Sequence, residues 1–300
     1  MDRDEPRLMR TSIYTGGTSP VKMIQAAFYN EDCIVYDLED SVSEDEKDAA
    51  RFLVYHLIKY QRPKDKYVIV RVNGIYSREI NEDLEAMVRV RPDALRIPKV
   101  EYAREIQALD KKITEMEKKA GLPEGEIRLW CNIESYTGVL NAREIAMASP
   151  RIEAMALGAE DFTASMMASR SKTGWEIFYA RNAILMACRE AGISAQDAVF
   201  SDVQDMEGLE RDLEMTKTLG FDGKTCIHPS QIERVNACFT PGIREIRKAE
   251  KVLEALEEAK QNHSGVCILD GSMIDKPMEI RARTILAKAK AAGIQTGGGV

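Results

Sequence analysis

The sequence predicts an α/β fold, a closed (β/α)8 TIM barrel followed by a C-terminal helical arm or lid. Short apolar segments alternate with helical patterns eight times, as expected for a parallel sheet that closes on itself. No Gly-x-Gly-x-x-Gly fingerprint follows the first strand, which favours the barrel over an open doubly wound sheet. The 300 residues suffice for a barrel of roughly 250 residues and an extension.

Each predicted strand is a short apolar run of the kind that is buried on both faces of a parallel sheet. The eight predicted strands are Thr11–Tyr14, Cys33–Leu38, Tyr67–Val72, Ala94–Ile97, Arg128–Ile133, Ala154–Leu157, Ala198–Ser201 and Lys224–Ile227. The clearest helical patterns between them are Glu44–Tyr60, Ala103–Ala120 and Gly174–Ala191. We therefore assign residues 1–240 to the barrel.

The pattern changes after the eighth strand. Ile243–Gln261 reads as a charged helix, Gly265–Leu269 is an apolar stretch, and a last helix is expected near Glu279–Ala292. We expect residues 241–300 to form an arm or lid rather than an independent domain. Gly297–Gly299 is expected to be a frayed tail.

Composition and charge argue against a nucleic-acid-binding, membrane or secreted protein. A net charge of −7 argues against binding to nucleic acid or to an anionic membrane. No segment reaches the ~20 apolar residues that span a bilayer, and the N-terminus lacks the apolar region of a signal peptide. The six cysteines include no Cys-x-x-Cys pair, which favours a reducing, cytoplasmic location.

Carboxylates stand at the ends of two predicted strands in the middle of the chain. Glu134 follows Leu129–Ile133, and Glu160 and Asp161 follow Ala154–Ala159. In TIM-barrel enzymes the catalytic residues lie at the carboxyl ends of the strands. Dehydrated carboxylates gathered there require a cation, and with oxygen ligands alone Mg²⁺ is the natural candidate.

A second acidic group ends the second predicted strand. Alternation sends Asp37 and Glu39 to one side of the strand and Asp40 to the other. Acids here also suit the N-terminus of the next helix. That alternative does not explain Asp37 within the apolar run, and we consider Glu39 and Asp40 as catalytic candidates at the active-site mouth.

Basic residues end three other strands. Arg71, which we expect to point the same way as Asn73, suits bidentate capture of a substrate carboxylate, although it also neutralises the acids nearby. Lys99 is a candidate to anchor a phosphate or to pair with an acid. His228 follows the eighth strand, where a lone histidine is more often structural than a ligand.

Taken together, the strand ends resemble those of the citrate lyase β-subunit family, in the aldolase group of the phosphoenolpyruvate/pyruvate barrel superfamily. The resemblance runs from about Arg10 to Ile294. It is carried by the order and spacing of six segments: Tyr36–Val42, Arg71–Asn73, Arg96–Lys99, Asn132–Ser135, Leu157–Asp161 and Gly220–Lys224.

The resemblance implies a role for five residues, two of which lie beyond these segments. Glu134 and Asp161 match the family's Mg²⁺ ligands, and Arg71 matches the arginine that holds the keto-acid carboxylate. Asp275 matches a lid aspartate similar to a catalytic acid/base in relatives. His228 matches a stretch near the coenzyme A moiety.

The implied reaction is cleavage of a citryl thioester to oxaloacetate and an acetyl thioester. A malyl-CoA or citramalyl-CoA lyase or thioesterase is the nearest alternative, and a non-catalytic CoA-ester-binding or assembly subunit is the alternative of another class. The intact acid pair argues against the last. The resemblance also implies a homotrimer, and acyl-carrier and CoA-transferase-like subunits as partners.

Two departures from the family concern the thioester end of the site. The first loop reads Tyr14-Thr15-Gly16-Gly17 where the family usually has Val-Pro-Gly, and Ser272 stands where many members carry lysine. The choice between CoA and an acyl-carrier protein therefore stays open. The sequence also leaves open whether Asp275 acts in its own subunit or in a neighbour.

Overall fold

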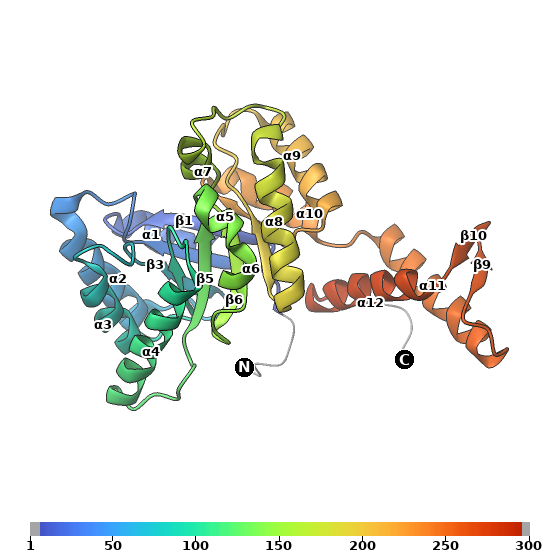
Figure 1. The fold of residues 1–300 in the computed structure, drawn as a ribbon, viewed down its shortest axis with the longest axis horizontal. Helices are drawn as coiled ribbons and strands as arrows, with labels where there is room; N and C mark the ends of the chain where they lie inside the picture. The colour runs from blue at the N-terminus through green and yellow to red at the C-terminus, as the bar shows by residue number, and fades with distance from the viewer. Residues whose placement is uncertain (1–6, 296–300) are drawn as a thin grey trace. The chain divides into compact units, whose positions relative to one another are not determined.

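The computed structural model describes residues 7–295, and the predicted Gly297–Gly299 tail lies outside them. Eight parallel strands form a closed barrel in chain order, with β8 pairing back to β1 (Figure 1). The strands are β1 (Thr11–Gly16), β2 (Cys33–Asp37), β3 (Tyr67–Arg71), β4 (Ala94–Ile97), β5 (Arg128–Ile133), β6 (Ile152–Leu157), β7 (Ser194–Asp197) and β8 (Gly223–Cys226). The predicted barrel fold is confirmed.

Seven of the eight predicted strands overlap observed strands. The exception is the seventh in chain order, whose predicted position is wrong. β7 is Ser194–Asp197, and the predicted Ala198–Ser201 is a connection after it. β7 escaped the search for apolar runs because two of its four residues, Gln196 and Asp197, are polar yet fully buried. Asp197 is neutralised by Arg181, at 2.9 Å, and by Lys224, at 2.5 Å.

Helices follow the strands and surround the barrel. The α-helices of this part are α1 (Pro20–Ala26), α2 (Lys47–Gln61), α3 (Ile80–Val90), α4 (Ala103–Lys119), α5 (Tyr136–Leu140), α6 (Ala142–Ala146), α7 (Ala159–Ser165), α8 (Trp175–Ala191), α9 (Met206–Leu219) and α10 (Ile232–Phe239). Short 3₁₀ turns, η1 (Glu44–Glu46) and η2 (Pro229–Gln231), precede α2 and α10. The three clearest helical predictions therefore correspond to η1 with α2, to α4 and to α8.

Alternation along the strands fills the barrel interior. A buried cluster holds side chains two residues apart on β2 and β3, with single residues from β4, β5 and β6: Cys33, Val35, Tyr67, Ile69, Ala94, Trp130 and Ala154. Two residues further toward the C-terminal ends, the interior positions of β2, β3 and β4 are the charged Asp37, Arg71 and Arg96, and that of β5 is the polar Asn132. The core thus changes from apolar to charged within one step along three of these strands.

The remaining residues form a second compact unit. The described chain divides into residues 9–236, which contain the barrel, and a second unit made of residues 7–8 and 237–295. Helix α11 (Ile243–Gln261), the hairpin of β9 (Cys267–Leu269) and β10 (Ser272–Ile274), and helix α12 (Lys276–Ala291) pack around Val252, Leu256, Ile274 and Ala282. That residues 241–300 are not an independent domain stays a prediction.

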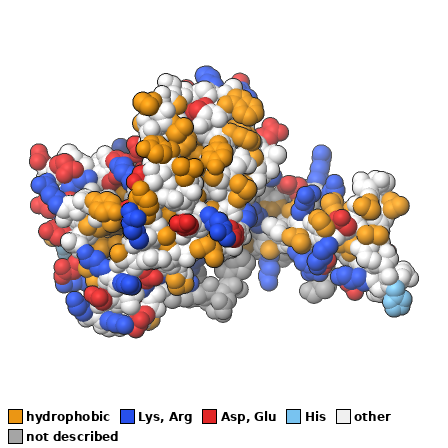
Figure 2. Space-filling view, in the orientation of Figure 1, with side chains coloured by type: hydrophobic (Ala, Val, Ile, Leu, Met, Phe, Trp, Pro, Cys, Tyr) orange, Lys and Arg blue, Asp and Glu red, His pale blue; other side chains and the backbone are white. Residues whose placement is uncertain are grey.

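The surface of the barrel unit carries an apolar face. Figure 2 shows hydrophobic side chains gathered over α5 and α8. The exposed apolar residues on these two helices are Tyr136, Leu140, Trp175, Phe178, Tyr179 and Met186. Within residues 7–295, no helix combines the length and apolarity needed to cross a membrane.

Candidate active site

Polar side chains continue the interior rows of the barrel to its C-terminal ends and line a pocket of about 410 Å³. Asp37, Arg71 and Arg96 each lie two residues beyond an interior apolar residue of β2, β3 and β4. The remaining residues of the lining come from β1, β5, β6 and β8, from the loops after the strands and from the first turn of α7: Tyr14, Asp40, Ser41, Asn132, Glu134, Leu157, Gly158, Ala159, Glu160, Asp161, Val199, Thr225 and Ile227.

Arg71 is held by three carboxylates. Its Nε and Nη2 donate to the two oxygens of Asp37 at 2.6 and 2.7 Å, and its Nη1 lies 2.9 Å from Glu39 and 3.3 Å from Asp40. Burial alone would raise the pKa of Asp37, but the hydrogen bonds from Arg71 hold it below its usual range. In this structure Arg71 neutralises the neighbouring acids. The sequence had indicated this role as the alternative to binding a substrate carboxylate.

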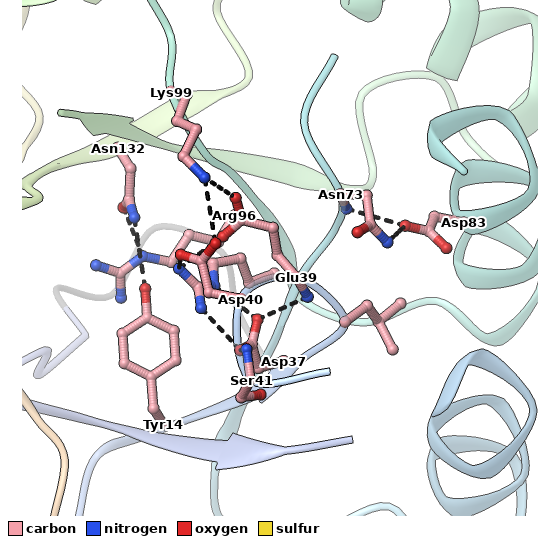
Figure 3. Close-up of polar contacts among 12 residues, drawn as sticks. Tyr14, Asp37, Glu39, Asp40, Ser41, Asn73, Asp83, Arg96, Lys99 and Asn132 are labelled. Atoms are coloured by element: carbon pink, nitrogen blue, oxygen red, sulfur yellow. Dashed lines mark hydrogen bonds and ion pairs between the residues drawn. The ribbon is translucent and has the colours of Figure 1, made fainter. Parts of the chain in front are cut away.

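Lys99 completes this cluster. Its Nζ donates to Glu39 at 2.5 Å and to Asp40 at 3.2 Å, and Figure 3 shows it directed at these two carboxylates. The prediction that Asn73 points the same way as Arg71 is wrong. The amide of Asn73 donates to Asp83 of α3 at 2.7 Å, away from the pocket, because the strand ends at Arg71 and alternation no longer applies.

A second chain of contacts links Arg96 to Glu134 through Asn132. Arg96 Nε donates to Asn132 Oδ1 at 2.6 Å, and Asn132 Nδ2 donates to Glu134 Oε1 at 2.7 Å. Tyr14 stands beside this chain, with its ring centre 4.9 Å from the Arg96 guanidinium and 4.6 Å from that of Arg71. Figure 3 shows the Tyr14 hydroxyl below Asn132, which donates to it at 3.4 Å.

Glu134 is a buried carboxylate with one oxygen left without a partner. Its side chain is 4% exposed, and Oε2 makes no hydrogen bond. Burial raises the pKa of Glu134 to about 7, and the charges of Glu39 and Asp161 add to that effect. An unpaired buried carboxylate of this kind is costly unless a cation accompanies it.

Asp161 supplies a second carboxylate on the same pocket. It lies in the first turn of α7, directly after β6, and is exposed. No cluster of three or more His, Cys, Asp or Glu residues in the described part of the chain is arranged for a metal. Mg²⁺ commonly takes only one or two carboxylates and completes its shell with water and substrate oxygens. The residues present therefore fit Mg²⁺.

The residues that line the pocket do not include the predicted site residues His228 and Asp275. His228 is exposed, is not among the pocket-lining residues described above, and caps η2 by accepting from the backbone N–H of Ser230 at 3.2 Å. That contact matches the structural alternative raised for a lone histidine. Asp275 belongs to the second unit, where it occupies the N-cap position of α12 without a side-chain capping bond.

Among the pocket residues that the sequence did not single out are Tyr14, Arg96, Asn132 and Gly158. Counting in steps of two along β4 and β5 would have placed Arg96 and Asn132 beside Arg71, since all three continue interior rows. Gly158 lies so close to Glu134 that a Cβ there would be 2.4 Å from Cγ of Glu134. This approach leaves no periodic signal, because it joins the ends of two strands.

The comparison with protein families settles which group this barrel belongs to. The model of the HpcH/HpaI aldolase/citrate lyase family matches residues 10–229, the whole of the barrel. The chain belongs to this family. The resemblance drawn from the strand ends is therefore confirmed, and with it the expectation of an enzyme of the lyase type.

Similar proteins of this aldolase/citrate lyase family extend the match into the C-terminal unit. The citrate lyase subunit beta of Leuconostoc mesenteroides subsp. cremoris is 43% identical over 285 residues, which are 95% of this chain and 94% of that protein. A (3S)-malyl-CoA thioesterase of Cereibacter sphaeroides is 36% identical over 283 residues, which are 94% of this chain and 95% of that protein.

A solved relative bears on the cofactors. The protein CitE of Mycobacterium tuberculosis, in complex with magnesium, acetoacetate and coenzyme A, superposes with a TM-score of 0.76 at 28% identity, covering 94% of this chain and 98% of that chain. Magnesium and coenzyme A, the predicted metal and one of the two predicted carriers, are thus both bound by a relative of the same fold.

Proposed function

We propose that this chain is a Mg²⁺-dependent carbon–carbon lyase that cleaves a citryl thioester to oxaloacetate and an acetyl thioester. The observation that carries the proposal is that Glu134 lines the pocket and that its buried Oε2 has no hydrogen-bond partner in the protein. The identity of 43% with a citrate lyase subunit beta supports the choice of reaction.

Glu134 and Asp161 would hold the metal. Bound Mg²⁺ supplies Lewis-acid chemistry, which stabilises negative charge on the substrate hydroxyl oxygen. Asn132 orients Glu134 by donating to Oε1, which leaves Oε2 for the cation. Burial of Glu134 excludes water from that side of the site and strengthens the attraction.

Arg71 would bind the carboxylate next to the reacting carbon. Its Nη1, shared between Glu39 and the exposed Asp40, is the donor most easily released to a substrate. Glu39, Asp40 and Lys99 form a charged group that sets the position of this donor. Glu39 and Asp40 stay catalytic candidates, Lys99 and His228 stay candidates for substrate binding, and all four roles are proposals.

Asp275 is proposed as the acid/base. A base takes the proton of the tertiary hydroxyl, the bond to the acetyl carbon breaks, and the electron pair passes to the thioester as an enolate. Protonation of that enolate releases the acetyl thioester, so protons balance over the reaction. Asp275 in the N-cap position of α12 has a carboxylate that capping does not occupy.

A second candidate is a malyl-CoA or citramalyl-CoA lyase or thioesterase. The observation in its favour is 36% identity with a (3S)-malyl-CoA thioesterase over nearly the whole chain. The same Mg²⁺ site would serve it, since malyl and citramalyl thioesters share the hydroxyl and the carboxylate beside it. A malyl-CoA or citramalyl-CoA lyase differs from the first candidate only in the group on the reacting carbon, whereas a thioesterase hydrolyses the thioester bond instead of the carbon–carbon bond.

The assembly is also part of the proposal. The exposed apolar residues of α5 and α8 support a homo-oligomer, a trimer by resemblance to the family. A citrate lyase complex would add an acyl-carrier and a CoA-transferase-like subunit.

The proposed location is the cytoplasm. Four cysteines are buried free thiols, as expected in a reducing compartment: Cys33, Cys131, Cys188 and Cys226.

The test is a substrate screen with purified protein. Citryl-CoA, malyl-CoA and citramalyl-CoA are supplied with and without Mg²⁺, and keto acid and thioester products are measured. We expect Mg²⁺-dependent release of oxaloacetate from citryl-CoA, at a higher kcat/KM than for the other two. Faster cleavage or hydrolysis of malyl-CoA would replace the first candidate by the second.

A further inference from the structure

We infer that Arg96 binds the second carboxylate of a dicarboxylic keto acid and so selects oxaloacetate over pyruvate or glyoxylate. The inference deepens the proposed function, on which the identity of the substrate rests. It starts from a contrast between Arg96 and the other buried arginines of the protein.

Five arginines are buried among residues 7–295, and Arg96 alone of them lacks an ion-pair partner there. The other four have a carboxylate at 2.6 to 2.9 Å: Arg51, Arg71, Arg151 and Arg181. Arg96 is 2% exposed, lies over the rings of Tyr14 and Trp130, and donates hydrogen bonds only to the neutral Asn132 Oδ1, at 2.6 Å, and Thr225 Oγ1, at 3.2 Å. Its Nη1 is buried and has no hydrogen-bond partner.

A purely structural arginine does not account for this arrangement. Burying a guanidinium without an anion costs several kcal/mol, and this protein neutralises its other buried guanidinium groups. Arg96 lines the pocket, so a ligand carboxylate can reach it without displacing a protein carboxylate. Arg71, in contrast, is already held by Asp37, Glu39 and Asp40.

The pocket therefore offers two unmatched buried atoms of opposite character. Glu134 Oε2 is an acceptor that requires a cation, Arg96 Nη1 is a donor that requires an anion, and Asn132 joins the two side chains. A dicarboxylic 2-keto acid bound with Mg²⁺ satisfies both. Pyruvate and glyoxylate have one carboxylate, which Arg71 and the metal bind, and so leave Arg96 unmatched.

The thioesters of the proposed function differ in this same group. The citryl group carries a carboxymethyl where the malyl group has hydrogen and the citramalyl group has methyl. A site that hydrogen-bonds a charged group rejects substrates that lack it, because its own buried donor is then left unpaired. Arg96 therefore favours the citryl thioester over the malyl and citramalyl thioesters.

The experiment measures binding of freshly prepared oxaloacetate and of pyruvate by calorimetry in MgCl₂, without thioester. We expect the wild type to bind oxaloacetate more tightly, and Arg96→Gln to weaken oxaloacetate by about 10- to 100-fold while pyruvate changes by less than about threefold. Arg71→Lys should weaken both keto acids.

Equal affinity of the wild type for the two keto acids overturns the inference, even if citryl-CoA is cleaved. Equal weakening of both by Arg96→Gln, in a variant with unchanged circular dichroism, also overturns it and makes Arg96 a positioning residue for Asn132. A selective loss of oxaloacetate binding supports it, even if the citryl thioester is not a substrate. Failure of the inference and failure of the proposed function are thereby distinguished.

Discussion

A Cβ atom on Gly158 would lie 2.4 Å from Cγ of Glu134, closer than two carbon atoms can approach. It would also lie 2.9 Å from Cδ and 3.0 Å from Oε1. Gly158 follows β6 and Glu134 follows β5, so the absence of a side chain at one strand end makes room for the carboxylate at the other. Gly158 is thus a part of the proposed metal site that binds nothing itself.

Gly158→Ala should therefore damage the site more than the fold. The clash forces Glu134 to move, and we expect a loss of ~1–3 kcal/mol in the free energy of unfolding. Mg²⁺ affinity should fall by about 10- to 100-fold, as for other groups that orient a ligand. Gly74→Ala is the matched control, since a Cβ there meets nothing within 4 Å. If Gly158→Ala binds Mg²⁺ like the wild type, Glu134 is not a ligand in this conformation.

Glu134→Gln should change stability and metal binding in opposite directions. A carboxylate whose folded pKa is about 7 costs stability as the pH rises above its ordinary value of 4.5, and the full cost is reached above pH 7. Without metal the variant should melt at a higher temperature than the wild type at pH 8, with a smaller difference at pH 5. Mg²⁺ should raise the wild-type melting temperature at pH 8 and leave the variant unchanged.

These melting curves also test the assignment. The Mg²⁺ effect on the wild type should shrink between pH 8 and pH 6, because protons then compete for Glu134. A Mg²⁺ shift of equal size in the wild type and in Glu134→Gln would place the metal elsewhere.

Asp197→Asn should lower stability by about 3–5 kcal/mol, since Arg181 and Lys224 would then share only Asp212. Burial raises the pKa of Asp197, but the charges of Lys224 and Arg181 prevail and hold it at about 2. The contribution of a carboxylate with a lowered pKa is complete above about pH 4 and is lost as the pH falls through 2. Guanidinium unfolding at pH 7 and pH 3 should show a smaller difference at pH 3.

Glu190→Gln is the control for that comparison. Glu190 forms an exposed pair with Arg143, so its loss should change the free energy of unfolding far less than Asp197→Asn at pH 7. A similarly small effect of Asp197→Asn would mean that the buried network does not stabilise the barrel.

Asp275→Asn should lower kcat by about 10²- to 10⁴-fold if the carboxylate transfers a proton. Stability should change little, because Asp275 makes no side-chain capping bond and asparagine suits the same position. Mixing Asp275→Asn subunits with Glu134→Gln subunits tests whether the arm acts on a neighbour. Partial recovery of activity is expected. No recovery, after subunit exchange has been verified, would confine Asp275 to its own subunit.

The sequence determined the barrel and the identity of its charged strand ends. Apolar runs predicted seven of the eight strands, since burial on both faces of a parallel sheet demands such runs. Glu134, Asp161 and Arg71 followed from their places at the ends of those runs, and all three line one pocket. β7 was missed because its buried Asp197 depends on Arg181 and Lys224, which lie 16 and 27 residues away.

Only the tertiary structure decided how the charges are matched. Which acids neutralise Arg71, which arginine lacks a carboxylate, and which oxygen of Glu134 is unpaired all depend on side chains brought together from different strands. The sequence does not distinguish Arg71 from Arg96, because both are arginines at the ends of neighbouring strands. The barrel places Asp37, Glu39 and Asp40 around the first and only neutral partners beside the second, and that difference makes Arg96 the free cation of the pocket among the described residues.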